Sequence, residues 1–133
     1  MATIWEKLNL KGHQEIVVLN APDSFAPQLA QLAVLNLHQH IQSLATLRFA
    51  LLFVTCQRQI DALVPLIAAR AYGDAIIWFA YPKAASKKYS CDFNRDTGWD
   101  LLRAAGFDTV RAVAIDEDWT ALRFRRKEFI QPR

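Results

Sequence analysis

The sequence predicts an α/β fold: a three-layer sandwich with a mostly parallel sheet of about five strands and an antiparallel C-terminal hairpin at its edge. Short apolar runs alternate with helical patterns along the chain, which is typical of right-handed βαβ units and of a parallel sheet. One run, 75–80 (AIIWFA), is apolar throughout, as expected for a strand that helices cover on both faces. Near the C-terminus, two runs flank the acidic segment 116–120, as in a β-hairpin.

The first strand is expected at 15–20 (EIVVLN), because a proline soon after it bars further sheet pairing. A helix capped by Asp23 or Ser24 is expected next. His38 and His40 fall on this helix two residues apart, where their side chains point in different directions and cannot bind one metal ion. The apolar positions of the helix recur three and four residues apart; they are Leu29, Leu32, Ala33, Leu37, Ile41 and Leu44.

The second strand is expected at 48–54 (RFALLFV), and Thr55 after it is a candidate cap for the next helix. This helix should kink or restart at Pro65, which lies too deep for a first-turn proline. It should end at Tyr72–Gly73, because glycine commonly follows the last helical turn. The third strand is the apolar run 75–80. For the first dozen residues, a short helix and an edge strand both stay open.

A polar loop then leads to Thr97–Gly98–Trp99–Asp100, which has the spacing of a capping box and predicts a short helix that ends at Gly106. Two strands are expected after it, at 110–115 and 122–130. In the second of these strands, leucine and phenylalanine alternate with arginines (LRFR). One face of this strand should therefore be buried and the other exposed to water.

Composition and motifs describe an ordinary folded protein. The 133 residues, 53% hydrophobic and 22% charged, fit one domain over 1–133. Cys56 and Cys91 are isolated, the N-terminus has no apolar segment of signal-peptide length, and the longest apolar runs are 7 to 8 residues; we therefore expect a cytoplasmic protein. No spacing matches a nucleophile triad, a metal site, a phosphate-binding glycine loop or a dinucleotide fingerprint. We expect no metal and no cofactor, and the sequence leaves open whether the protein is an enzyme.

Ligands of open parallel sheets bind at the carboxyl ends of the strands. The loop after the third strand is the longest in the chain, at about 16 residues, and long loops in compact domains are usually functional or disordered. Three aromatic residues, Tyr81, Tyr89 and Phe93, could pack this loop against the domain. The strand ends should bring together Asn20, Pro22 and Asp23; Thr55, Cys56 and Gln57; and Tyr81, Pro82 and Lys83.

We predict that this edge binds an anionic small molecule: a phosphate, a nucleotide or a carboxylate. Lysines and hydroxyls cluster early in the loop, and the helix expected at Thr97 could hold an anion at its N-terminus. The alternative is that the lysines are only solvated, that Thr97 only caps its helix, and that Arg95 pairs with a neighbouring aspartate to pin the loop. The predicted ligand-binding residues are Lys83, Ser86, Lys87, Asn94, Arg95, Asp96, Thr97, Asp23 and Tyr81.

Three further groups of residues are candidates for a function: the acids 116–118, Cys91, and the two tryptophans Trp5 and Trp119. The acids 116–118 could bind Mg²⁺ through oxygen ligands, or could simply keep a hairpin turn in water. Cys91 lies in a basic stretch, as reactive thiols do, but has no histidine beside it in the sequence. Trp5 and Trp119 lie among polar residues and could mark a contact surface.

The basic residues concentrate at the C-terminus. Residues 1–120 carry 11 Lys and Arg against 12 Asp and Glu, whereas 121–133 carry five against one. A basic strand of this kind attracts phosphate backbones or acidic partners. The alternative function is therefore a non-catalytic module for protein or nucleic-acid interaction that uses 123–127 and an exposed edge strand, with the protein a monomer or a homodimer.

Residues 78–126, with WFAYPK, NRD, GWD and VAIDEDW.ALRFR, resemble a family of small bacterial proteins known as a domain of unknown function. The resemblance covers most of the chain and implies a stand-alone cytosolic α/β domain, with no activity assigned. The family often has glycine after YPK, where this chain has Ala84. A distant relationship to nucleotide-binding or methyltransferase-like folds rests on architecture alone, and the lack of a glycine fingerprint after the first strand argues against it.

Overall fold

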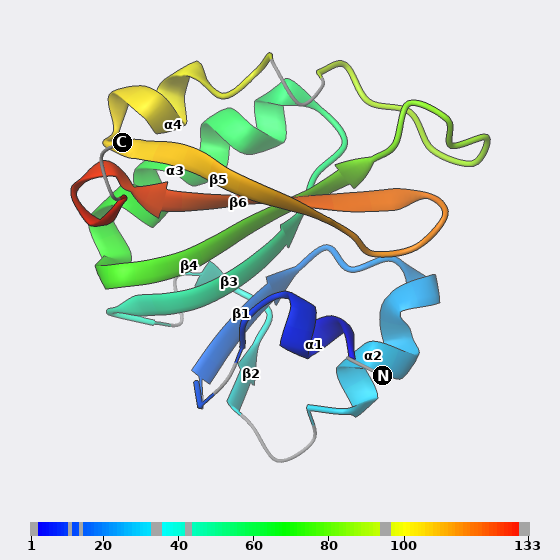
Figure 1. Ribbon diagram of the computed structural model, residues 1–133, viewed down its shortest axis with the longest axis horizontal. Coiled ribbons are helices and arrows are strands. Elements are labelled where there is room, and N and C mark those ends of the chain that lie inside the picture. Colours follow the sequence, from blue (N-terminus) through cyan, green and yellow to red (C-terminus); the bar gives the residue numbers. More distant parts are fainter. Residues whose placement is uncertain are drawn as a thin grey trace.

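A six-stranded sheet with strand order β2-β1-β3-β4-β6-β5 organises the chain in the computed structural model (Figure 1). Strands β2, β1, β3 and β4 are parallel, and β6 runs antiparallel to both β4 and β5. The structure describes residues 3–10, 12–13, 15–32, 36–41, 44–93 and 97–130. The strands are β1 (Glu15–Leu19), β2 (Asn36–His38), β3 (Leu47–Phe53), β4 (Ala71–Pro82), β5 (Phe107–Ala114) and β6 (Trp119–Arg126).

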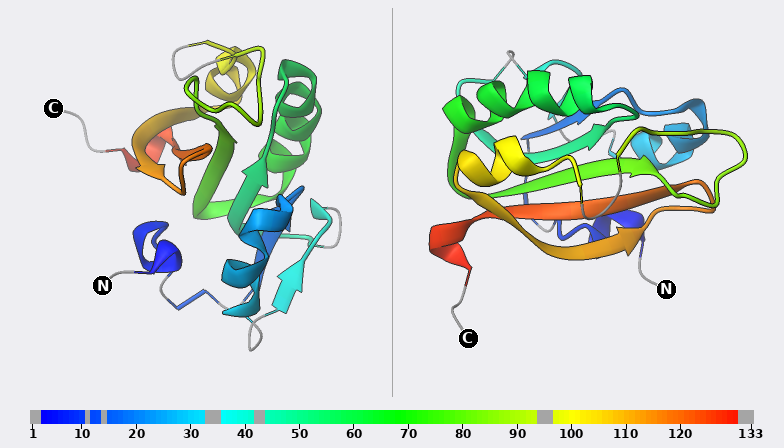
Figure 2. Two further views of the ribbon diagram at one scale, coloured as in Figure 1. Left: turned by 90° about the vertical axis from the view of Figure 1, so that its right-hand side faces the viewer. Right: turned by 90° about the horizontal axis from the view of Figure 1, so that it is seen from above.

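Helices cover both faces of the sheet, so the predicted three-layer α/β fold is confirmed. Figure 2 shows α3 (Gln57–Arg70) and α4 (Asp100–Ala104) on one side of the sheet and α1 (Ile4–Lys7) on the other. The short helices η1 (Asp23–Phe25) and α2 (Ala26–Ala30) pack with α1, and η3 (Lys127–Phe129) follows β6. No described helix is both long and apolar enough to span a membrane.

The core has two halves, one on each face of the sheet, because side chains alternate along β4. Ile77, Phe79 and Tyr81 pack toward α3 and α4, whereas Trp78 and Ala80 pack toward α1 and α2. The indole Nε1–H of the fully buried Trp78 donates to the Leu8 carbonyl oxygen at 2.8 Å. This bond satisfies the one polar atom of that side chain.

The helix expected after Pro22 is wrong for most of its length. Helix α2 ends at Ala30, and residues 36–38 form β2, which pairs in parallel with β1. Leu37 and His38 therefore lie in a strand, not on a helix. Apolar residues three and four apart fit a helix, but the unpaired edge of β1 offers a competing set of backbone hydrogen bonds, and tertiary pairing overrides local propensity.

Helix α3 and strand β4 also differ from expectation at their boundary. Helix α3 runs unbroken through Pro65, because Val64 and Ile67 are buried against the sheet while Pro65 points to solvent. The helix ends at Arg70, and Gly73, with φ +56°, lies inside β4 where the pairing with β3 shifts register. Glycine here permits a β-bulge and does not end the helix.

Three surface predictions are also wrong. Trp5 is 5% exposed and Trp119 is 3% exposed, so both belong to the core and neither marks a contact surface. Strand β6 lies between β4 and β5, so the edge strands of the sheet are β2 and β5 and the basic final strand is not at an edge. The N-terminus, for which a helix and an edge strand were both open, is a separate case: it forms the helix α1, and Thr3 and Glu6 form a capping box at its start.

Candidate functional site

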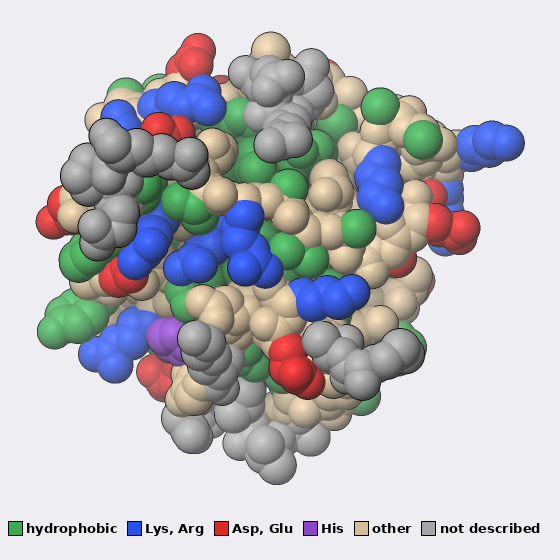
Figure 3. All heavy atoms as spheres, viewed as in Figure 1, with side chains coloured by type: hydrophobic (Ala, Val, Ile, Leu, Met, Phe, Trp, Pro, Cys, Tyr) green, Lys and Arg blue, Asp and Glu red, His purple; other side chains and the backbone are tan. Residues whose placement is uncertain are grey.

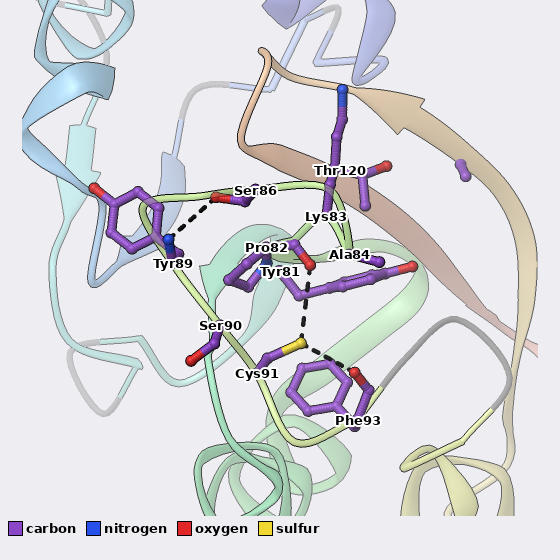
Figure 4. Close-up of a pocket in the computed structure, with 11 residues that line it drawn as sticks. Tyr81, Pro82, Lys83, Ala84, Ser86, Tyr89, Ser90, Cys91, Phe93 and Thr120 are labelled. Atoms are coloured by element: carbon purple, nitrogen blue, oxygen red, sulfur yellow. Dashed lines mark hydrogen bonds between the residues drawn. The ribbon is translucent and has the colours of Figure 1, made fainter.

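A pocket of about 530 Å³ opens where β4 ends, beneath the loop 83–93 (Figure 4). Tyr81 forms part of the pocket from β4, and Thr120 of β6 and Ala112 of β5 close the side toward the hairpin. Tyr81 and Thr120 are directly paired across β4 and β6, so their side chains lie on the same face of the sheet. The loop contributes Lys83, Ala84, Ser86, Tyr89, Ser90, Cys91 and Phe93.

The first half of the loop is tied to the β5–β6 turn through Asp118. The Lys83 backbone N–H donates to the Asp118 carbonyl oxygen at 2.8 Å, and the Ser86 hydroxyl donates to Asp118 Oδ1 at 2.9 Å. Ser86 Oγ also accepts from the backbone N–H of Tyr89 at 3.1 Å. Its hydroxyl therefore holds the loop in shape, in a serine turn.

The second half of the loop is tied to α3. Asp92 Oδ1 accepts from the Gln57 backbone N–H at 2.7 Å, and the Gln57 side-chain Nε2 donates to the Gly98 carbonyl oxygen at 2.8 Å. Gly98 has φ +97°, and a Cβ there would lie 2.6 Å from Gln57 Oε1 and 2.9 Å from Phe93 Cβ. Only glycine fits this position without displacing its neighbours.

Aromatic contacts hold the loop on both faces of the sheet, as the sequence suggested. The Phe93 ring lies 5.5 Å from that of Tyr81 and 5.2 Å from that of Trp99. On the other face, the Tyr89 ring lies 4.9 Å from that of Trp119. The loop therefore wraps around the end of β4 and forms an ordered wall for the pocket.

The pocket combines an apolar and aromatic wall with one charged group. Lys83 is the one charged side chain among its described lining residues, and Ser90 and Thr120 supply hydroxyls. In Figure 4 the Lys83 side chain extends alongside Thr120 and away from Cys91 and Phe93. The two ends of the pocket therefore differ: one is cationic, and the other is apolar.

Cys91 is half-buried and its Sγ lies 3.0 Å from the Phe93 carbonyl oxygen and 3.8 Å from the Pro82 carbonyl oxygen (Figure 4). Both partners accept a hydrogen bond, so the thiol acts as a donor within the loop. No described histidine lines the pocket beside it. The arrangement lacks the neighbouring base that activates a catalytic cysteine.

Two of the three acids of the β5–β6 turn, Asp116 and Asp118, have structural partners. Asp116 Oδ1 accepts from the backbone N–H groups of Asp118 at 2.8 Å and Trp119 at 2.9 Å, which closes the turn. Asp118 holds the loop through Ser86. Among the described residues, no group of three acids, histidines or cysteines could hold a metal ion.

The structure brings together three of the predicted ligand-binding residues: Tyr81, Lys83 and Ser86 line the pocket. Lys87 is exposed on the loop and does not line it. Asp23 is exposed at the start of η1, after β1, and is not among the lining residues either. Asn94, Arg95 and Asp96 lie outside the described residues.

The capping box predicted at Thr97 is wrong. Trp99 is the N-cap of α4 in place of Thr97, and the helix has no capping hydrogen bond from the side chain of its N-cap residue. The helix is five residues long and has Asp100 in its first turn. A carboxylate at this end repels an anion, and so short a helix carries little dipole. The reason for anion binding at Thr97 is therefore lost.

Among the described residues, the strand ends do not line one shared pocket. A row of edge-to-face aromatic contacts fills the space between them: the Phe25 and Phe53 rings are 5.0 Å apart, and the Phe53 and Trp119 rings are 5.2 Å apart. The ends of β1 and β2 instead line a separate pocket of about 310 Å³, which includes Asn20 and His40. These aromatic residues are far apart in the sequence, so the sequence did not predict that their rings would be in contact at the ends of the strands.

Two lining residues, Ala112 and Thr120, were missed because they come from the hairpin. Thr120 was placed in the turn, although it is the second residue of β6 and lies two residues before the buried Leu122. The alternation of side chains along a strand would have placed Thr120 on the same face as Leu122. This alternation was the one sequence signal that could have identified Thr120 as a pocket residue.

Three solved structures with a similar arrangement of strands and helices match the chain at low sequence identity. A SAM-dependent methyltransferase from Aquifex aeolicus matches with a TM-score of 0.65 and 11% identity over 92% of this chain and 87% of that one. Magnesium protoporphyrin IX methyltransferase from Synechocystis PCC 6803, with bound SAH, matches with a TM-score of 0.57 and 14% identity over 93% and 78%. The pyocyanin biosynthetic protein PhzM matches with a TM-score of 0.55 and 13% identity over 92% of this chain, which spans 53% of the PhzM chain.

No protein-family model and no curated protein sequence matches the chain. Identities of 11 to 14% show the fold alone. The chain therefore has a Rossmann-like α/β fold of the kind seen in these methyltransferases, with the reversed strand β6 inserted between β4 and β5.

Proposed function

We propose that the protein binds a small molecule with an apolar or aromatic body and one anionic group, a carboxylate or a phosphate, in the pocket beneath the loop 83–93. The observation that carries this proposal is the lining: Lys83 is its one charged group, set against an aromatic wall. A volume of about 530 Å³ lies within the range of small-molecule sites. The ordered loop would present these groups with little loss of conformational entropy on binding.

The proposed pose follows from the two ends of the pocket. The anionic group would lie beside the Lys83 ammonium, which can form a charge-assisted hydrogen bond with it. Thr120 lines this end of the pocket, but its hydroxyl donates to the Val113 carbonyl oxygen at 3.3 Å. The body would lie toward Phe93 and Cys91, where it would bury apolar surface. Ser86 is engaged by Asp118, so in this proposal it supports the loop and leaves the direct contact to Lys83.

The residues of this chain fit SAM, the cofactor named for the structural neighbours, poorly. In such folds, a nucleoside cofactor is bound by a glycine-rich turn after the first strand and by a carboxylate after the second strand. Here the turn after β1 is Asn20-Ala21-Pro22, with Asn20 itself at φ +58°, and β2 is followed by Gln39 and His40. A proline has no N–H to donate. We therefore propose no methyl transfer.

The proposal places the protein in a reducing compartment, the cytoplasm. Cys56 and Cys91 are both free thiols, and the Cys91 thiol is used as a hydrogen-bond donor within the loop. Oxidation of Cys91 would remove that donor and disturb the wall of the pocket. The resemblance of residues 78–126 to a small bacterial family of unknown function is a further part of this proposal.

The test is a thermal-shift screen of the protein with sugar phosphates, nucleotides, and aromatic and aliphatic carboxylates. A ligand at 100 times its Kd should stabilise the fold by about 2.7 kcal/mol and raise the melting temperature by several degrees. Lys83→Gln should weaken binding of the best ligand at least tenfold. Lys87→Gln, which makes the same charge change on an exposed loop residue outside the pocket, should bind like the wild type.

A steric variant separates the pocket from general charge effects. Ala112 is exposed on the edge strand and lines the pocket, so Ala112→Phe should fill the space and abolish binding while the fold is kept. The proposal fails if no compound shifts the melting temperature, or if the three variants bind the best ligand equally well.

A further inference from the structure

Three arginines form a cluster on the face of the sheet that α1 partly covers; we call Arg111, Arg123 and Arg125 the arginine cluster. Arg123 lies directly opposite Arg111 across β5 and β6, and directly opposite Trp78 across β4 and β6. Arg125 lies two residues further along β6 on the same face. Figure 3 shows Lys and Arg side chains gathered near the centre of this face.

The cluster has one hydrogen-bonded acidic partner among the described residues. Asp74 of β4 accepts two hydrogen bonds from Arg125, at 2.8 Å from Nε and 2.7 Å from one terminal nitrogen. Asp108 lies directly opposite Arg125 across β5 and β6, but it forms an ion pair with Arg103, so its charge is already offset. Arg111 donates to the Lys7 carbonyl oxygen at 2.7 Å and lies over the Trp78 ring at 5.8 Å. None of the described ion pairs includes Arg111 or Arg123. Three cations and one anion leave the cluster with two positive charges in excess.

Arg123 is the residue that this imbalance affects most. Its side chain is half-buried between two other arginines, and its Nε atom is fully buried without a hydrogen-bond partner. Burial lowers the pKa of Arg123, and the charges of Arg125 and Arg111 lower it further, although Asp74 raises it. Like charges placed directly opposite each other on a sheet are destabilising. A charged strand residue that destabilises the fold and has no acidic partner is typical of a binding site.

We infer that the arginine cluster binds a phosphate monoester group. The guanidinium fork matches the geometry of phosphate oxygens, and a monoester carries close to two negative charges at neutral pH, about −1.5 to −2. That charge balances the excess of the cluster, whereas a carboxylate or a phosphodiester would balance half of it. Arg111 is exposed and provides access from solvent, and Arg123 supplies charge from beneath.

This site is independent of the loop pocket. Thr120 and Leu122 of β6 face α3 and α4, and Arg123 faces the opposite side of the sheet. A ligand in the loop pocket therefore cannot contact the arginine cluster. Each of the two sites can be removed without changing the lining of the other.

The test measures binding of methyl phosphate by calorimetry at constant ionic strength, with dimethyl phosphate and acetate as singly charged comparisons. Methyl phosphate should bind the wild type at least tenfold more tightly than either comparison. Arg123→Gln and, separately, Arg111→Gln should each weaken it at least tenfold; the exposed position of Arg111 keeps the second variant informative if the first does not fold. Arg58→Gln, the same substitution on the exposed face of α3, should bind like the wild type.

Lys83→Gln should keep full affinity for methyl phosphate, so failure of the loop-pocket proposal and failure of this one can be told apart. The inference is overturned if acetate or dimethyl phosphate binds as tightly as methyl phosphate. It is also overturned if the arginine variants bind like Arg58→Gln. A short oligonucleotide that binds through these arginines while methyl phosphate does not would assign the face to nucleic acid instead.

Discussion

The backbone N–H of Gln57 donates to the carboxylate of Asp92 at 2.7 Å, across 35 residues of sequence. Gln57 is the first residue of α3, so this carboxylate satisfies one of the N–H groups that a helix leaves free at its start. The Gln57 side chain also reaches the Gly98 carbonyl oxygen. The two ends of the segment 92–98 are therefore fixed to one residue of the longest helix.

We expect Asp92→Ala to lower the free energy of unfolding by about 1 kcal/mol, because a capping carboxylate near a helix N-terminus is lost. Asp92→Asn should recover most of this loss, since asparagine also accepts such a bond. Urea unfolding measures both. Glu117→Gln, at an exposed acid of the hairpin turn, is the control and should leave stability unchanged; equal effects of Asp92→Ala and Glu117→Gln would contradict the capping role.

Gly98→Ala should cost about 3 kcal/mol, because a left-handed backbone and two close contacts add together. Gly106 has nearly the same φ, +98°, but nothing lies within 4 Å of a Cβ placed there. Gly106→Ala should therefore show the backbone strain alone, about 1 kcal/mol. Chemical denaturation of both variants gives the comparison, and equal losses would mean that Gln57 and Phe93 move aside at no cost.

Much of the fold could be predicted because its strands are buried. The expected strand at 48–54 differs from β3 by one residue at each end, and 75–80 lies wholly within β4. Such runs are apolar on both faces, which few other structures require. In contrast, Tyr72, Gly73 and Asp74 extend β4 at its exposed start, where side chains carry no apolar signal.

The missed features depend on long-range contacts. Strand β2 is three residues long and exists through its pairing with β1. Asp92 was expected beside Arg95, which lies outside the described residues; its described partner is the backbone N–H of Gln57 at the start of α3. Local patterns contain no information about either contact, because pairing and capping partners come from distant parts of the chain. The length of the loop after β4 identified it as a candidate site, but the sequence did not show which residues of other elements would contact the loop.

His13 should make stability depend on pH near neutrality. Its ring lies 6.0 Å from that of Phe49, and burial followed by the charge of Arg48 lowers the pKa of His13 below 6.5. The unfolded chain therefore binds the proton more readily, so the contribution of His13 to stability is present above pH 6.5 and is lost as the pH falls through the folded pKa.

We expect the free energy of unfolding to fall between pH 7 and pH 5, and His13→Gln to remove part of that slope. His40→Gln retains His13 and should keep this component. Urea unfolding at several pH values measures all three proteins. Parallel curves for the wild type and His13→Gln would contradict the assignment.

Asp74 should act at lower pH. The hydrogen bonds from Arg125 hold the pKa of Asp74 below 3.8 although partial burial opposes this, so the ion pair contributes above about pH 4 and is lost as the pH falls through the folded pKa. Both side chains are about one-third exposed, at 31% and 35%. A double-mutant cycle of Asp74→Asn and Arg125→Gln should therefore give a coupling of about 0.5 kcal/mol at pH 7. The coupling should decrease as the pH falls below about 4; a constant value down to pH 2 would show that charge does not matter.

Asp74→Asn should also tighten phosphate binding. It removes the one carboxylate of the arginine cluster and frees Arg125, so the excess charge rises from two to three and a further guanidinium fork becomes available. We expect the affinity for methyl phosphate to increase about threefold to tenfold at low ionic strength, and this gain to shrink as salt is added, because the site is open to solvent. Asp61→Asn makes the same change on α3, on the opposite face of the sheet, and should leave the affinity unaltered. If Asp74→Asn weakens binding instead, the carboxylate orients the arginines for the ligand, and excess charge does not explain the cluster.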